Sequence, residues 1–265
     1  QPSKRSFFCV RDVWAIANCM MSRIQHSWLL LILGIGLVTQ AALFFYSGPL
    51  GQEQTLITAR NFVLHASFFT TVLLVIVAGS TELPREVDTG TLLFVLGKPV
   101  RRYHIFAGKL LGLSLLGVAA VIMQVALGAG VLLARGFNPG TVYLFESLFV
   151  VLRIAIIAAA TVTCTVWFHE FPTLFFCGLY LAIGMHMSLA DYFIRFFPAP
   201  LSVSLPLRGV YYLFPNFSHL TVLGAAAVKP GAGILSLGVL YGVVYFLFLA
   251  CFGAWGFQYR EFERL

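Results

Sequence analysis

Residues Thr81–Lys109 have the sequence TELPREVDTGTLLFVLGKPVRRYHIFAGK, a charged and glycine-punctuated segment between two long apolar runs. It contains three acidic residues and five of the 17 lysines and arginines in the chain. Apolar runs of about 20 residues match the hydrocarbon thickness of a bilayer. We therefore expect residues 82–104 to form a loop that emerges from a membrane into water.

The composition of the whole chain also indicates a membrane protein. Hydrophobic residues make up 60% and charged residues only 10%, against about a quarter charged in soluble domains. Six continuous apolar runs predict an all-α protein with six transmembrane helices, because barrel strands would alternate with a period of two. The six runs are Trp28–Tyr46, Asn61–Thr81, Ile105–Ala134, Val142–Phe168, Phe171–Ala190 and Gly233–Tyr259.

Positive charge is divided unequally between the two sides that six spans would define. The side with both termini and the 82–104 loop carries 11 of the 17 lysines and arginines, and the opposite side carries five. This excess predicts that both termini lie in the cytoplasm. The net charge of +7 follows from this topology, so it is no evidence for nucleic-acid binding.

The first 26 residues carry a helical pattern. Apolar residues recur at spacings of three and four, which predicts an amphipathic helix over 1–26. Its apolar face fits the membrane interface or the flank of its own bundle, and the helix could also contribute to a partner's docking surface. The stripe consists of Phe7, Val10, Trp14, Ala17, Met21 and Ile24.

The region 191–230 is a long external loop in this topology. Its apolar stretches Val210–Phe214 and Phe217–Leu223 are too short to span, which favours re-entrant or interfacial helices. No repeat or low-complexity linker divides the chain, so residues 1–265 are predicted to form one transmembrane domain.

Inside the 82–104 loop the pattern predicts a short helix. Thr89, Gly90 and Thr91 can begin it, since threonine caps free N–H groups. Gly97 suits the residue after its end, and Pro99 prevents continuation.

The motifs D-T-G-T-L-L at 88–93, G-K-P-V-R-R at 97–102 and G-K at 108–109 resemble permease subunits of type-2 ABC transporters. The resemblance extends to the amphipathic helix, the six spans and the long external loop. The run YYLFPNFSHL at Tyr211–Leu220 is similar to permeases associated with copper-site maturation of nitrous-oxide reductase.

This resemblance implies a coupling element that inserts into a cleft of a cytosolic ATPase subunit. The alternative is that the charges only solvate a loop. The residues that the resemblance places at the coupling element are Glu82, Arg85, Glu86, Asp88, Gly90, Thr91, Leu93, Lys98, Pro99 and Arg101.

The chain has no P-loop of its own. The G-K pairs at 97–98 and 108–109 lack the glycine that precedes a P-loop G-K by four intervening residues, and they lack the hydroxyl residue that follows it. We therefore expect no enzyme activity and no cofactor on this chain, with ATP and Mg bound by a partner subunit.

Two charged residues interrupt the fourth apolar run. Glu146 and Arg153 are seven residues apart and share a helix face, although two turns separate them beyond direct contact. Intramembrane charges face protein or water. Arg153 could therefore pair with another span or a backbone carbonyl, or line a substrate path or dimer interface.

A metal site is not expected. Met185, His186 and Met187 suggest copper(I) ligands, but residues two apart on a helix point about 200° apart. His186 is the one weak candidate.

The resemblance predicts a permease in a prokaryotic plasma (inner) membrane. Its expected partners are two ATP-binding cassette subunits, a second permease copy and membrane lipid, with an extracytoplasmic protein as a further candidate and no nucleic acid. The external region would be an exit lid or a dock, formed by Tyr211, Tyr212, Phe214, Pro215 and Asn216.

Two alternatives remain for this chain. It could transmit force to an extracytoplasmic partner without substrate passage, or act as a scaffold without an ATPase. A secondary transporter or channel would need paired intramembrane acids or matching broken helices, and neither is seen.

Overall fold

The computed structural model describes residues 5–24, 34–36, 38, 40, 42, 52–89, 102–196, 214–221 and 232–259. These residues are helical or lie in turns, and none is in a strand. The helices are α1 (Arg5–Ile24), α3 (Gln52–Asp88), α5 (Arg102–Ala134), α6 (Gly140–Trp167), α7 (Glu170–Phe196), the 3-10 helix η1 (Phe217–Leu220) and α9 (Ala232–Tyr259).

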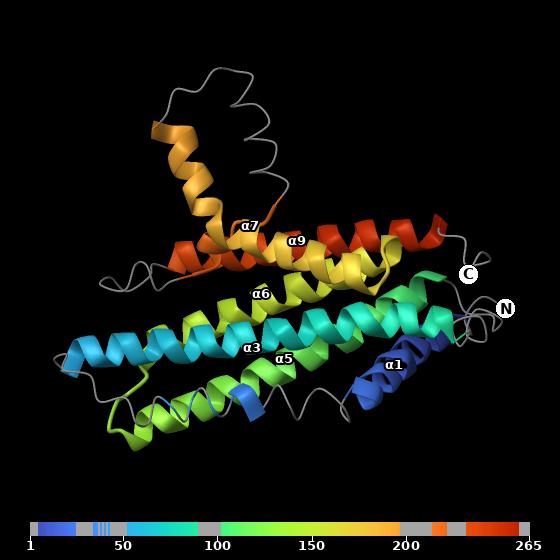
Figure 1. The fold of residues 1–265 in the computed structure, drawn as a ribbon. Coiled ribbons are helices and arrows are strands. Elements are labelled where there is room, and N and C mark those ends of the chain that lie inside the picture. The colour runs from blue at the N-terminus through green and yellow to red at the C-terminus, as the bar shows by residue number, and fades with distance from the viewer. Residues whose placement is uncertain are drawn as a thin grey trace.

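Helix α6 is the centre of the bundle. It packs against α3, α5, α7, α9 and η1, and its most apolar 18-residue stretch is 78% buried. The corresponding stretch of α9 is only 22% buried, so α9 lies at the edge. Figure 1 shows α3, α5, α6 and α9 running alongside one another, with α7 bending away from the bundle toward its C-terminal end.

Among the described residues, four helices are long and apolar enough to cross a membrane: Thr55–Glu86, Arg102–Ala134, Gly140–Trp167 and Ser236–Tyr259. They correspond to the second, third, fourth and sixth predicted spans. The fifth predicted span lies within α7, which is not among the four. The first, Trp28–Tyr46, lies mostly outside the described residues, so six spans remain a prediction.

The predicted loop 82–104 is shorter than expected, because its two ends are helical. Helix α3 continues past Thr81 to Asp88 with Pro84 inside it, and α5 already begins at Arg102. Thr89 ends α3 instead of starting a new helix, since its N–H and Oγ1 donate to the Arg85 carbonyl at 2.9 and 2.8 Å. The rest of the predicted short helix lies in residues 90–101, outside the described part.

Helix α1 packs against the first turns of α5, but with a rotated face. Ala17 and Met20 are buried, whereas Trp14, which was expected on the apolar stripe, is 59% exposed. Glycines set the contact: a Cβ at Gly108 would lie 2.8 Å from Ile16 Cβ, and one at Gly112 would lie 3.0 Å from the Ala17 carbonyl oxygen. Small residues four apart allow this close approach of two helices.

The end of the bundle that holds α1 also holds the C-terminal end of α3 and the N-terminal end of α5 (Figure 1). The C-terminal end of α9 lies at this end too. The described ends of α3 and α5, on either side of residues 90–101, therefore lie at the same end of the bundle as α1. Residues 135–139 and η1 lie toward the opposite end.

Candidate functional site

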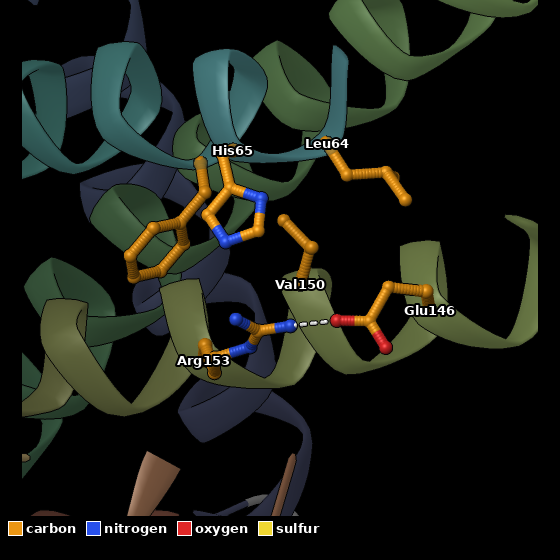
Figure 2. Close-up of a pocket in the computed structure, with 6 residues that line it drawn as sticks. Leu64, His65, Glu146, Val150 and Arg153 are labelled. Carbon is orange, nitrogen blue, oxygen red and sulfur yellow. Dashed lines mark hydrogen bonds and ion pairs between the residues drawn. The ribbon is translucent and has the colours of Figure 1, made fainter. Parts of the chain in front are cut away.

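The two intramembrane charges of α6 form a direct ion pair. Arg153 Nη2 donates a hydrogen bond to Glu146 Oε1, and the two residues are 8% and 1% exposed (Figure 2). The expectation that they are too far apart to touch was wrong. Helical side chains lean toward the N-terminus, so the long arginine side chain reaches back over two turns to the carboxylate.

Helix α3 covers this ion pair from one side. The Arg153 guanidinium carbon lies 5.3 Å from the ring centre of Phe68, which is 1% exposed. A cation over an aromatic face is attracted by the ring quadrupole, more strongly when water is excluded. Leu64 and His65 of α3 complete a small recess with Val150 of α6 (Figure 2).

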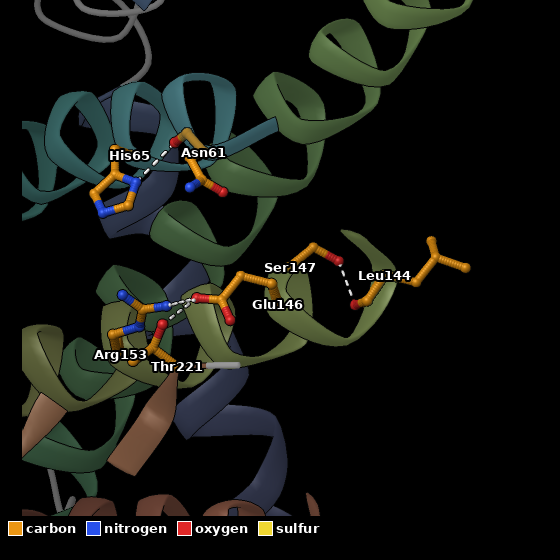
Figure 3. Close-up of polar contacts among 7 residues, drawn as sticks. All are labelled: Asn61, His65, Leu144, Glu146, Ser147, Arg153 and Thr221. Carbon is orange, nitrogen blue, oxygen red and sulfur yellow. Dashed lines mark hydrogen bonds and ion pairs between the residues drawn. The ribbon is translucent and has the colours of Figure 1, made fainter. Parts of the chain in front are cut away.

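His65 is exposed at the mouth of this recess. Its Nδ1 lies 2.7 Å from the Asn61 carbonyl oxygen in the preceding turn of the same helix (Figure 3). A carbonyl only accepts, so Nδ1 carries the hydrogen and Nε2 is an acceptor while the ring is neutral.

The segment 214–221 contributes a third group to the buried pair. Thr221 Oγ1 donates to Glu146 Oε1 at 3.1 Å (Figure 3). Thr221 directly follows η1, so a short turn is bonded to a carboxylate inside the bundle. No pattern in the sequence predicts this contact, because Glu146 and Thr221 are 75 residues apart.

The segment 214–221 is held at several other points. Asn216 Oδ1 accepts from the Ser218 N–H at 3.0 Å and so caps η1, while the Asn216 N–H donates to the Tyr241 hydroxyl of α9 at 2.8 Å. Phe217 and Leu220 are buried. A Cβ at Gly184 of α7 would lie 2.7 Å from the Phe217 ring, so this glycine makes room for it.

The predicted lid residues are only partly described. Phe214, Pro215 and Asn216 belong to this buried segment, and the Phe214 ring lies 5.6 Å from that of Tyr180. Tyr211 and Tyr212 lie outside the described residues. Of the predicted helix Phe217–Leu223, the structure describes a single 3-10 turn.

At the opposite end of the bundle a second ion pair joins the helices that flank the predicted coupling segment. Lys109 Nζ of α5 donates to Glu86 Oε2 of α3, and Lys109 is 4% exposed. Lys109 was not among the predicted site residues, although it follows Gly108 in the second G-K pair.

The predicted coupling residues fall into two groups. Glu82 and Glu86 are half-buried and Arg85 is exposed near the end of α3, which closes at Asp88. Their contact with an ATPase stays a prediction, as it does for those outside the described residues: Gly90, Thr91, Leu93, Lys98, Pro99 and Arg101.

A further polar cluster ties α3 to α5. Thr70 Oγ1 donates to Gln124 Oε1 at 2.5 Å, and Gln40 Nε2 donates to Ser67 Oγ at 3.1 Å and to the Gln124 carbonyl at 3.0 Å. These side chains are at most 7% exposed. Polar residues of this kind hold apolar helices together where no water competes.

The weak metal candidate makes a local contact. His186 Nδ1 lies 2.9 Å from the Ala182 carbonyl oxygen of α7, and His186 is exposed while Met187 is buried. Within the described ranges, no three His, Cys, Asp or Glu residues are grouped closely enough to hold a metal ion.

A bundle with several membrane-length apolar helices and a charge pair in its interior defines a multi-pass integral membrane protein. The chain belongs to the ABC-2 family transporter proteins, because that family's model matches residues 19–193, about two thirds of its length. The match covers α3, α5, α6 and most of α7, including residues 82–104 and the ion pair, but neither η1 nor α9. No curated protein matches the chain.

Proposed function

We propose that this chain is the permease subunit of a prokaryotic ABC transporter in the plasma (inner) membrane, with both termini in the cytoplasm. It works as a homodimer with two cytosolic ATPase subunits that bind ATP and Mg. The observation that carries the proposal is the family match, which extends over the spans and the segment between α3 and α5. Membership implies an ATP-binding cassette partner, and the chain has no P-loop of its own.

The segment between α3 and α5 is the proposed contact for the ATPase. The helices on both sides of it are bonded through Lys109 and Glu86 at their cytosolic ends. A displacement of the segment would therefore move α3 and α5 together, which is the kind of rigid-element shift by which nucleotide binding is transmitted. The energy comes from the different affinities of the ATPase for two arrangements of this segment.

The output at the opposite side is either export or force on an extracytoplasmic partner. The second is favoured by one observation: the external segment is bonded to the interior of the bundle at Glu146 instead of lying free over it. On the run Tyr211–Leu220 we further propose the subtype that serves copper-site maturation of nitrous-oxide reductase.

Affinity purification from native membranes tests the proposal against the scaffold alternative. A permease brings down a nucleotide-binding subunit in stoichiometric amount, whereas a scaffold yields none. In reconstituted vesicles, Arg101→Glu should lower ATP hydrolysis about tenfold without changing membrane insertion. Arg135→Glu at the other end of α5 is the matched control and should leave hydrolysis unchanged.

A further inference from the structure

The Glu146 carboxylate joins three parts of the protein. It accepts from Arg153 of its own helix and from Thr221 behind η1. Arg153 in turn lies over the Phe68 ring of α3. One buried oxygen, Glu146 Oε1, thus lies between α3 and the external segment 214–221.

We propose that Glu146 is a latch that holds the external segment 214–221 on the bundle, and that α3 controls this latch through Phe68 and Arg153. The inference rests on the proposed function for its driver, the ATPase. The inference goes beyond the proposed function because it names the contact that would open on the extracytoplasmic side.

The two bonds of Glu146 differ in the free energy needed to break them, and this difference determines which bond opens. Separating Arg153 from Glu146 would leave two charges unpaired in a dry interior, which is strongly unfavourable. Releasing Thr221 loses one hydrogen bond and leaves the ion pair intact. The hydroxyl contact is therefore the weak link, and the carboxylate stays neutralised in the open state.

The remaining contacts of the segment support a hinged release. Asn216 bonds to Tyr241 of α9, and Phe217 sits against Gly184 of α7. These contacts and the buried Leu220, which lies beside Gly242 of α9, hold the segment up to residue 220. The Thr221 hydroxyl bond ties its end to Glu146 of α6.

Helix α3 is suited to operate the latch because it is one helix from Gln52 to Asp88. Phe68 and Glu86 are 18 residues apart, which is about 27 Å along an α-helix. A shift of α3 at the Glu86–Lys109 pair would displace the Phe68 ring. That displacement would draw the guanidinium, and with it the carboxylate, away from Thr221.

Hydrogen–deuterium exchange of the reconstituted protein alone tests the latch without any ATPase. Thr221→Val keeps the shape and removes the donor, so amide exchange over residues 214–221 should accelerate roughly ten- to a hundredfold. Thr221→Ser restores the hydroxyl and should exchange like the wild type. Thr161→Val is the matched control, because the buried Thr161 hydroxyl donates to the Ile157 carbonyl of its own helix and lies 15 residues from Glu146 along α6. An unchanged rate in Thr221→Val overturns the latch.

The α3 connection has its own pair of variants. Phe68→Leu keeps an apolar side chain but removes the ring under Arg153, and it should accelerate exchange over 214–221. Phe106→Leu removes a similarly buried ring from α5 that packs against Phe257 of α9 and has no described arginine over it, and it should not accelerate exchange. Equal rates in the two variants overturn the role of α3.

Adding the ATPase subunit and a non-hydrolysable nucleotide separates this inference from the proposed function. If nucleotide accelerates exchange over 214–221 in the wild type but causes no further acceleration in Phe68→Leu, both the latch and the proposed function are supported. If Thr221→Val and Phe68→Leu act as expected but nucleotide has no effect, the latch stands and the ATP-driven function is contradicted.

Discussion

Lys109 of α5 and Glu86 of α3 form an ion pair at the end of the bundle where the predicted coupling segment leaves it, with Lys109 only 4% exposed. Two helices that are separated in the sequence by that segment are thereby joined at its base. The ion pair therefore bonds the two helices that flank the segment to each other.

The Glu86–Lys109 pair predicts an asymmetry between single substitutions. Glu86→Gln removes the carboxylate that faces a buried ammonium group, and it should cost about 2 to 3 kcal/mol of stability. Lys109→Met leaves a carboxylate that is 18% exposed and can reach water, so its cost should be about 1 kcal/mol. Thermal unfolding in detergent measures both. The double variant Glu86→Gln with Lys109→Met should be more stable than Glu86→Gln alone, and a simple sum of the two losses would contradict direct pairing.

Gly108 predicts how tightly α1 is held. Gly108→Ala would place a methyl group 2.8 Å from Ile16 Cβ, so α1 must shift, at about 1 to 3 kcal/mol. Limited proteolysis should then cut within residues 5–24 faster. Gly130→Ala in the same helix is the control, since a Cβ there meets nothing within 4 Å and should be neutral or slightly stabilising. If both variants resist protease equally, α1 does not pack on α5 in this way.

Arg153 predicts a strongly non-additive pair with Glu146. Arg153→Met alone strands a carboxylate that is 1% exposed and should cost about 3 to 5 kcal/mol. Adding Glu146→Gln removes the stranded charge and should recover most of that loss. The yield of folded protein and its unfolding temperature in detergent report the recovery. A double variant that is worse than Arg153→Met would mean that Glu146 is stabilised by groups other than Arg153.

Four of the helices could be predicted from the sequence because each is a continuous apolar run. In lipid the backbone polar groups of such a run must bond to one another, which favours a helix. It misplaced the end of α3, since Glu82–Asp88 is charged and contains Pro84, while the helix there gains a partner on α5. Charge content predicted a loop from residue 82 to 104, whereas residues 82–88 continue α3 and residues 102–104 begin α5.

The sequence identified Glu146 and Arg153 as members of the polar site, but it did not predict that they contact each other. Glu146 and Arg153 stood out because charge within a span is costly. Their direct contact depends on rotamers, and the third partner, Thr221, comes from a distant segment that only the tertiary fold brings close. The side of α1 that packs on α5 could not be predicted from α1 alone, because Gly108 and Gly112 of α5 select it. Ala17 of the predicted stripe lies on that side, whereas Trp14 does not.

The central claim is that a cytosolic ATPase subunit grips the segment between α3 and α5, and site-specific photo-crosslinking in intact cells tests it most directly. A photoreactive amino acid at Leu93 should give a covalent product with a nucleotide-binding subunit. The same probe at Leu144, which is 66% exposed near the N-terminal end of α6, should give none. A product at Leu93 with an extracytoplasmic protein, or labelling of Leu93→Cys only from outside the cell, would contradict the account.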